Sequence, residues 1–94
     1  MNEQPRKNTL TNRYELDLDG KLAYLSYEEW PTGEVAFTST FVPPELRGKN
    51  VAAVLTRFAL EDARAQGRTV VPQCSYAAAY LERNPEYADL RAAS

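Results

Sequence analysis

Residues 42–52 read Val-Pro-Pro-Glu-Leu-Arg-Gly-Lys-Asn-Val-Ala. A β-branched and aromatic run at residues 35–42 stops at the two prolines, and a helical pattern starts at Val51. A strand, a basic glycine-containing loop and a helix in that order bring backbone N–H groups and a helix N-terminus to one point, which attracts phosphate. The loop therefore predicts an anion site. An ordinary strand-to-helix loop with exposed basic residues is the alternative.

Three strands are predicted before this loop. Residues 14–18 alternate apolar and charged side chains, which is typical of a half-buried strand. The Asp-Gly pair at residues 19–20 predicts a tight hairpin turn into a second strand at 21–28. A turn at residues 30–33 leads to the third strand, residues 34–42. Short turns between successive strands predict an antiparallel meander.

A β-α-β crossover follows the meander. Apolar residues at helical spacing predict a helix of about four turns from Val51, with Gly67 as its C-terminal cap. Residues 69–72 are predicted to be a short strand that is buried on both faces, and residues 75–83 a helix that stops at Asn84-Pro85. The predicted fold class is thus α+β, close to an α/β sandwich. The crossover is expected to be parallel and right-handed.

Ligands of such crossovers bind outside the carboxyl ends of the strands. Here those ends are Val42 with its loop and the Pro72-Gln73-Cys74 segment. We therefore expect the phosphate-binding candidate and the single cysteine to lie on the same side of the sheet. Because Cys74 comes just before a helix N-terminus, it is a candidate nucleophile or a polar neighbour of the ligand. The alternative for Cys74 is a small buried core residue.

Composition narrows the class of protein. At 94 residues, one domain is expected, over residues 12–94, after a flexible tail at 1–11. The formal charge of −2 argues against a general nucleic-acid binder. No apolar stretch has the length of a membrane span or a secretory signal. One cysteine forms no intrachain disulfide, which favours a reduced, cytoplasmic setting.

The absence of histidine restricts the chemistry further. Without it the chain has no Ser–His or Cys–His nucleophile pair and no histidine base. A metal site is not expected, because one cysteine and carboxylates make a poor zinc ligand set. Any chemistry falls to carboxylates, Tyr, Lys, Cys, backbone groups or water.

The loop at residues 47–52 resembles the acetyl-CoA loop of the GNAT N-acetyltransferase superfamily, whose motif runs Arg/Gln-x-x-Gly-x-Gly/Ala. More narrowly, the chain from Tyr14 to Leu90 resembles a small single-domain GNAT subfamily with a Pro-x-Cys motif. The matching segments are the hairpin at 19–25, Thr40, Val42-Pro43-Pro44, Arg47-Gly48, Ala52, Pro72-Gln73-Cys74 and Arg83-Asn84-Pro85-Glu86-Tyr87.

Two positions depart from the family pattern. Asn50 stands where the family has its second loop glycine, and Ser39 stands where the subfamily usually has histidine. Asparagine tolerates the left-handed backbone region and serves as a helix cap, so the loop is expected to survive with less room for a pyrophosphate. Any role that the family gives to the histidine is absent.

The resemblance implies acetyl-CoA or CoA as the cofactor and direct attack of an amine on the thioester. Backbone N–H groups near Phe41 and Val42 would stabilise the oxyanion. The expected catalytic residues are Cys74 and Tyr80. The expected cofactor-binding residues are Phe41, Val42, Arg47, Gly48, Lys49, Asn50, Val51, Ala52, Cys74, Tyr76, Arg83 and Asn84.

Several of these assignments have a structural alternative. Tyr76 and Tyr80 share a helix face at i, i+4 spacing and either meet the cofactor or pack in the core. Arg83 and Asn84 either contact the cofactor or end the helix. The candidate general base is water or a carboxylate such as Glu28 or Glu34. A weak base is sufficient, because an uncharged amine needs little help to attack.

Two other functions stay open. One is a CoA-binding or protein-interaction module of the same fold with weak or lost catalysis, which Ser39, Asn50 and the absence of histidine favour. The other is an acyl carrier that holds the acetyl group on Cys74. The acceptor amine is expected to be a protein tail, a polyamine or a small amine. The chain is expected to be a monomer or a weak homodimer.

Overall fold

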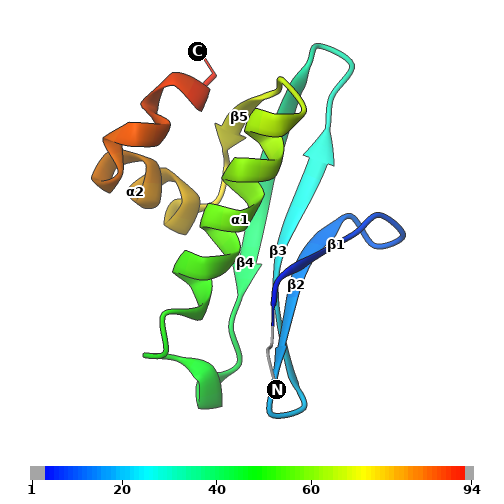
Figure 1. Cartoon of the computed structure of the whole chain (residues 1–94), viewed down its shortest axis with the longest axis vertical. Coiled ribbons are helices and arrows are strands. Elements are labelled where there is room, and N and C mark those ends of the chain that lie inside the picture. Colours follow the sequence, from blue (N-terminus) through cyan, green and yellow to red (C-terminus); the bar gives the residue numbers. More distant parts are fainter. Residues whose placement is uncertain (1–3, 93–94) are drawn as a thin grey trace.

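The computed structural model describes residues 4–92 (Figure 1). Its five-stranded sheet has the order β1-β2-β3-β4-β5. The first four strands are antiparallel neighbours, and β5 is parallel to β4. The strands are β1 Arg6–Asn8, β2 Arg13–Leu18, β3 Lys21–Glu29, β4 Glu34–Phe41 and β5 Thr69–Pro72. The α helices are α1 Val51–Ala65 and α2 Ser75–Arg83, and the 3-10 helices are η1 Pro44–Leu46 and η2 Pro85–Leu90.

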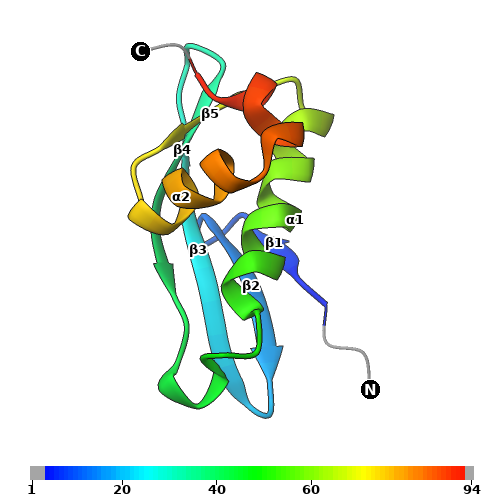
Figure 2. The same cartoon turned by 90° about the vertical axis from the view of Figure 1, so that its left-hand side faces the viewer.

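The helices form one layer and the sheet forms the other. Figures 1 and 2 show α1 and α2 on the same side of the sheet. Inward-facing strand residues such as Leu16, Leu25 and Phe37 pack with Leu55 and Leu60 of α1 in one buried cluster. Alternation along the strands and a period of 3.6 along α1 create these two apolar faces. The predicted meander, crossover and C-terminal helix are therefore confirmed.

The short strand β5 corrects one expectation. Only Val70 is buried, whereas Thr69, Val71 and Pro72 keep part of their surface exposed. The sequence predicted burial on both faces, but helices cover only one face of this sheet. An apolar run of four residues cannot report which of its faces is covered.

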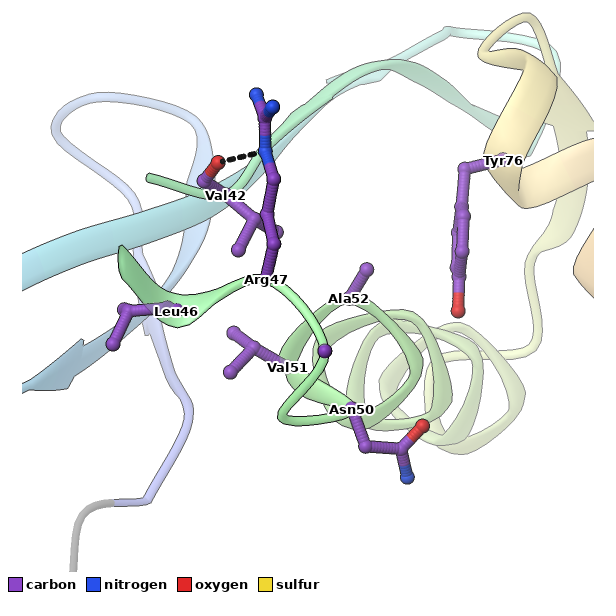
Figure 3. Close-up of a pocket in the computed structure, with 8 residues that line it drawn as sticks. Val42, Leu46, Arg47, Asn50, Val51, Ala52 and Tyr76 are labelled. Carbon is purple, nitrogen blue, oxygen red and sulfur yellow. Dashed lines mark hydrogen bonds between the residues drawn. The ribbon is translucent and has the colours of Figure 1, made fainter. Parts of the chain in front are cut away.

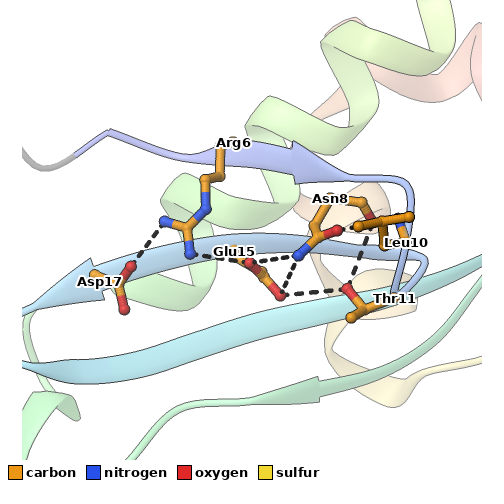
Figure 4. Close-up of polar contacts among 6 residues, drawn as sticks. All are labelled: Arg6, Asn8, Leu10, Thr11, Glu15 and Asp17. Carbon is orange, nitrogen blue, oxygen red and sulfur yellow. Dashed lines mark hydrogen bonds and ion pairs between the residues drawn. The ribbon is translucent and has the colours of Figure 1, made fainter.

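The N-terminal strand β1 was not predicted. Residues 6–8 pair with β2, although the sequence analysis placed them in a flexible tail; residues 1–3 of that tail lie outside the described residues. Arg6 donates to Glu15 at 3.0 Å and to Asp17 at 2.8 Å, while Asn8 donates to Glu15 at 3.2 Å (Figure 4). Because β1 is held by charged and polar groups, it lacks the hydrophobic alternation that identifies strands.

The strands β4 and β5 separate halfway along β4. Their pairing covers only Glu34 to Phe37 of β4, and the Cys74 N–H then donates to the Phe37 carbonyl at 2.9 Å. Opposite β3, the register shifts so that Tyr27 faces Phe37 while Ser26 faces Ser39. β4 thus has one extra residue between Phe37 and Ser39. An extra residue in a strand bends that strand. The second half of β4 therefore continues without β5 beside it, toward the loop at residues 42–52.

The predicted end of α1 is also confirmed. Gly67 adopts a φ of 69°, its N–H donates to the Arg64 carbonyl at 3.1 Å, and the Arg68 N–H donates to the Ala63 carbonyl at 2.9 Å. This pair of bonds is a Schellman motif, in which glycine supplies the left-handed residue. The tight end sends the chain directly into β5.

Candidate functional site

A pocket of about 360 Å³ lies where the β4–α1 loop meets α2 (Figure 3). Its lining combines the loop, the first turn of α1 and one tyrosine of α2. The lining residues are Val42, Leu46, Arg47, Gly48, Asn50, Val51, Ala52 and Tyr76. All of them except Leu46 were predicted from the sequence to bind the cofactor. Leu46 is 1% exposed, and its apolar side chain carries no signal that separates a pocket wall from the core.

The loop has a defined backbone. The Arg47 N–H donates to the Pro44 carbonyl and the Lys49 N–H to the Leu46 carbonyl, each at 3.3 Å. Gly48 has a φ of 85° and Asn50 a φ of 65°. An L side chain is strained in this left-handed region, and asparagine is among the residues that tolerate it best. Asn50 makes no capping hydrogen bond, so it meets the backbone requirement without capping the helix.

The first turn of α1 offers free donors to the pocket. The Val54 N–H is the first to close a helical hydrogen bond, to the Asn50 carbonyl at 3.1 Å. The N–H groups of residues 51–53 have no acceptor among the described residues. Together with the helix dipole, they make this end of α1 attractive to an anion.

The two basic residues of the loop differ in position. Arg47 donates from Nε to the Val42 carbonyl at 3.2 Å, which holds its side chain along the pocket (Figure 3). Lys49 is exposed and does not line the pocket. Arg47 is therefore the cation that is built into the pocket wall.

The thiol of Cys74 meets a hydroxyl at the point where β4 and β5 separate. Its Sγ atom lies 3.1 Å from Oγ1 of Thr40, and either atom can be the donor. Cys74 is half-buried, packs against the core and precedes α2. The sequence named Cys74 but not Thr40 as a site residue. Thr40 matched the family pattern, and only the fold brings these residues together across 34 positions.

The tyrosines of α2 divide between the pocket and the core. Tyr76 is 36% exposed and lines the pocket, whereas Tyr80 packs against the core and does not line it. Their rings are stacked at 6.3 Å between centroids, as their i, i+4 spacing predicts. Burial raises the pKa of both hydroxyls above the ordinary value for tyrosine, and a neighbouring arginine partly offsets this in each.

The remaining predicted residues lie outside the pocket. Asn84 donates from Nδ2 to the Tyr80 carbonyl at 2.8 Å, and Arg83 is exposed in the last turn of α2. Phe41 is 43% exposed and packs on Tyr24 at 5.5 Å between ring centroids. Their contact with a cofactor stays a prediction.

The two candidate bases lie toward the other end of the β3–β4 hairpin. Glu28 accepts from the Trp30 indole N–H at 2.7 Å, and Glu34 accepts from the Thr32 hydroxyl at 2.8 Å. Glu34 begins β4, whereas the pocket loop follows its end. Each carboxylate thus has a local structural partner.

Residues 4–92 contain neither a candidate membrane-spanning helix nor a candidate metal-ligand cluster. No helix in this range is long and apolar enough to cross a membrane. Nor does the range contain a group of three or more His, Cys, Asp or Glu side chains arranged to hold a metal ion.

Comparison with known proteins places this site in context. A solved structure of a GCN5-like putative N-acetyltransferase from Staphylococcus aureus matches with a TM-score of 0.76 and 25% sequence identity, over 99% of this chain and 91% of that one. A search of curated proteins finds no match. The family model for GCN5-related N-acetyl-transferases matches residues 13–90, which span the sheet from β2 onward, the pocket and both α helices. The chain therefore belongs to the GCN5-related N-acetyltransferase family.

Proposed function

We propose that this chain is an N-acetyltransferase that moves an acetyl group from acetyl-CoA to an amine by direct attack, within a single domain over residues 12–94. The observation that carries the proposal is the pocket at the start of α1, beside the opening between β4 and β5. It combines the free N–H groups at the start of α1 with the half of β4 that has β3, but not β5, as a neighbour. Family membership supports acetyl-CoA as the cofactor.

The residues present fit the diphosphate of CoA. The pocket holds the free N–H groups at the start of α1 and the Arg47 guanidinium. A Cβ on Gly48 would meet no atom within 4 Å, so glycine is required there by its φ of 85° and not by crowding. We propose that Arg47, Gly48 and residues 50–52 hold the diphosphate, with Lys49 adding positive charge at the rim.

The reaction needs mainly positioning and oxyanion stabilisation. Bound acetyl-CoA would supply a thioester, whose acetyl group passes to the amine nitrogen as the C–S bond breaks and the thiolate leaves. Backbone N–H groups of Phe41 and Val42, at the end of β4, would stabilise the oxyanion. Cys74, fixed by Thr40, would line the thioester end of the opening. Water would take the proton that the amine nitrogen loses. The Tyr80 hydroxyl would protonate the leaving thiolate and regain its own proton from water, with Arg83 and Asn84 on polar groups of the cofactor.

A second candidate is a CoA-binding module with weak or lost catalysis. Ser39 replaces the histidine of the subfamily, and Asn50 replaces the loop glycine. Any role that the subfamily gives to the histidine is absent here, and the Asn50 side chain leaves less room for the diphosphate than glycine would. Binding of CoA without turnover of acetyl-CoA would favour this candidate.

The first experiment is titration of the whole chain with CoA and acetyl-CoA, followed by amide NMR shifts and thermal melting. We expect a concentration-dependent rise in Tm, because a ligand that binds only the native state stabilises it. The matched variants are Arg47→Gln, in the pocket, and Arg91→Gln, an exposed arginine outside it. Arg47→Gln should weaken binding by roughly tenfold or more, and Arg91→Gln should not. No response to millimolar ligand would refute both candidates.

The second experiment separates enzyme from module and carrier. Acetyl-CoA turnover is measured with a peptide carrying a free amine, a polyamine and a small amine as acceptors. An N-acetyltransferase gives amine-dependent release of CoA with at least one of them. Intact-mass measurement after exposure to acetyl-CoA tests the carrier candidate, since only a carrier accumulates one acetyl group that Cys74→Ala abolishes.

A further inference from the structure

Tyr76 stands on the opposite wall of the pocket from Arg47. Figure 3 shows the Tyr76 ring hanging from α2 with its hydroxyl directed toward the first turn of α1, near Ala52. The Arg47 side chain rises on the other side of the same space. The start of α1 therefore has a cation on one flank and a phenol on the other.

The Tyr76 ring is held in this position by its neighbours. Tyr80 stacks against it at 6.3 Å, and Tyr87 packs on Tyr80 at 6.4 Å between centroids. The Tyr87 hydroxyl donates to Glu61 of α1 at 2.6 Å. A row of three rings, anchored on α1, thus supports the pocket wall from behind. Such support lowers the entropy that Tyr76 loses when it contacts a ligand.

The hydroxyl of Tyr76 is available to a ligand. It makes no hydrogen bond to another side chain among the described residues, and the residue keeps 36% of its surface exposed. Burial raises its pKa, although the charge of Arg83 partly offsets this. The phenol therefore keeps its proton at neutral pH and has a hydrogen bond to donate.

We propose that the Tyr76 hydroxyl donates a hydrogen bond to the phosphate group that binds at the start of α1. The anion site then has donors from both the loop and α2. This inference rests on the proposed function, because it names an atom for the same ligand. Tyr76 acts as a specificity residue: it favours carriers that bear a phosphate, such as CoA, over pantetheine, which has none. The donor on α2 also adds a phosphate contact to a loop that has Asn50 in place of glycine.

The test compares Tyr76→Phe with the wild type by calorimetric titration at fixed ionic strength. The ligands are CoA, inorganic pyrophosphate and pantetheine. The variant removes one oxygen that has no side-chain partner, so its melting temperature should equal that of the wild type. The control is Tyr24→Phe, which removes a hydroxyl from a tyrosine that does not line the pocket.

We expect Tyr76→Phe to weaken CoA and pyrophosphate by about tenfold, as for a hydrogen bond to a charged group, with pantetheine unchanged. Tyr24→Phe should alter none of the three. Equal CoA affinity in the wild type and Tyr76→Phe would overturn the inference, as would a parallel loss for CoA and pantetheine. A chain that binds pyrophosphate through Tyr76 but does not bind CoA would refute the proposed function while supporting this inference.

Discussion

Asn50 stands where the family motif has glycine, and its backbone is in the left-handed region that glycine favours. Its φ of 65° lies in the left-handed region, and its side chain makes no capping bond to α1. Figure 3 shows that side chain directed away from Arg47. The substitution therefore keeps the course of the loop, because asparagine reaches this backbone region at lower cost than other side chains do.

Replacing Asn50 with glycine should change little. We expect a change in unfolding free energy within about 0.5 kcal/mol, since glycine and asparagine are both tolerated at such a position, and CoA affinity within about twofold. Thermal melting and titration measure the two quantities. The contrasting variant is Asn50→Val, because a β-branched residue is strained at positive φ and should lose roughly 1–2 kcal/mol. A gain in affinity above tenfold for Asn50→Gly would show that the side chain obstructs the site.

Thr40 and Cys74 form a pair that the sequence did not connect. A hydroxyl can accept a hydrogen bond from a thiol and donate one to a thiolate. At 3.1 Å, Thr40 can therefore serve Cys74 in both protonation states. Cys74 is the single cysteine of the chain, so thiol chemistry reports on it alone.

Thr40→Val should slow the alkylation of Cys74. Valine has nearly the shape of threonine but offers the thiolate no hydrogen bond, and we expect a reduction of about tenfold at neutral pH. Mass spectrometry of the iodoacetamide adduct over time gives the rate. Thr40→Ser restores a hydroxyl and should restore most of it. Equal rates in the wild type and Thr40→Val would mean that the contact has no effect on reactivity.

At the scale of the elements, a charged cluster joins β1 to α1. The Nζ atom of Lys7 in β1 lies 2.9 Å from Oδ2 of Asp62 in α1. The same oxygen accepts a hydrogen bond from the Tyr14 hydroxyl of β2 at 2.8 Å. Lys7 lies over the Tyr14 and Tyr27 rings as well. Burial alone would raise the pKa of Asp62, but hydrogen bonds from Lys7, Tyr14 and Gln66 outweigh it and lower the pKa.

The cluster makes stability depend on pH. Since the pKa of Asp62 is lower in the folded chain than the ordinary 3.8, its stabilisation is complete above about pH 4 and is lost as pH falls through the folded value. We expect Asp62→Asn to cost about 1 kcal/mol at pH 7 and progressively less below pH 4. Urea unfolding at several pH values measures this. A constant difference from pH 7 to pH 2.5 would contradict the expectation.

On the scale of the whole molecule, one core connects the sheet to the last helical turn. Leu90 of η2 is 6% exposed and belongs to the same buried cluster as Leu16 of β2 and Leu60 of α1. The C-terminal segment also pairs with β5, through the Ala92 N–H and the Val70 carbonyl at 2.8 Å. Elements that share one core unfold together.

Unfolding should therefore be a single transition. Trp30, the one tryptophan, reports on the β3–β4 turn by fluorescence, and far-UV circular dichroism reports on the helices. We expect the two urea curves to coincide. Leu90→Ala should shift both by the same amount, with a loss of about 2–3 kcal/mol as for a buried leucine. A helical transition that precedes the change in fluorescence would show that η2 and α2 unfold separately.

The order of elements and the location of the loop were determined by the sequence alone. Alternation in residues 14–18, the Asp-Gly turn, the helical spacing after Val51 and Gly67 are local signals, each arising from the geometry of neighbouring residues. The same local chemistry placed a helix N-terminus after a basic loop, and the pocket lies there. Strand β1 could not be predicted from local signals, because charged residues of another strand hold it in place.

Tertiary structure alone decided which side chains meet. It separated β4 from β5 after Phe37, joined Thr40 to Cys74, and turned Tyr76 to the pocket and Tyr80 to the core. It also left one face of β5 uncovered, against expectation. These outcomes depend on distances between residues far apart in the chain, which packing sets and local periodicity does not encode. The sequence determined where the pocket lies, and the fold determined which side chains line it.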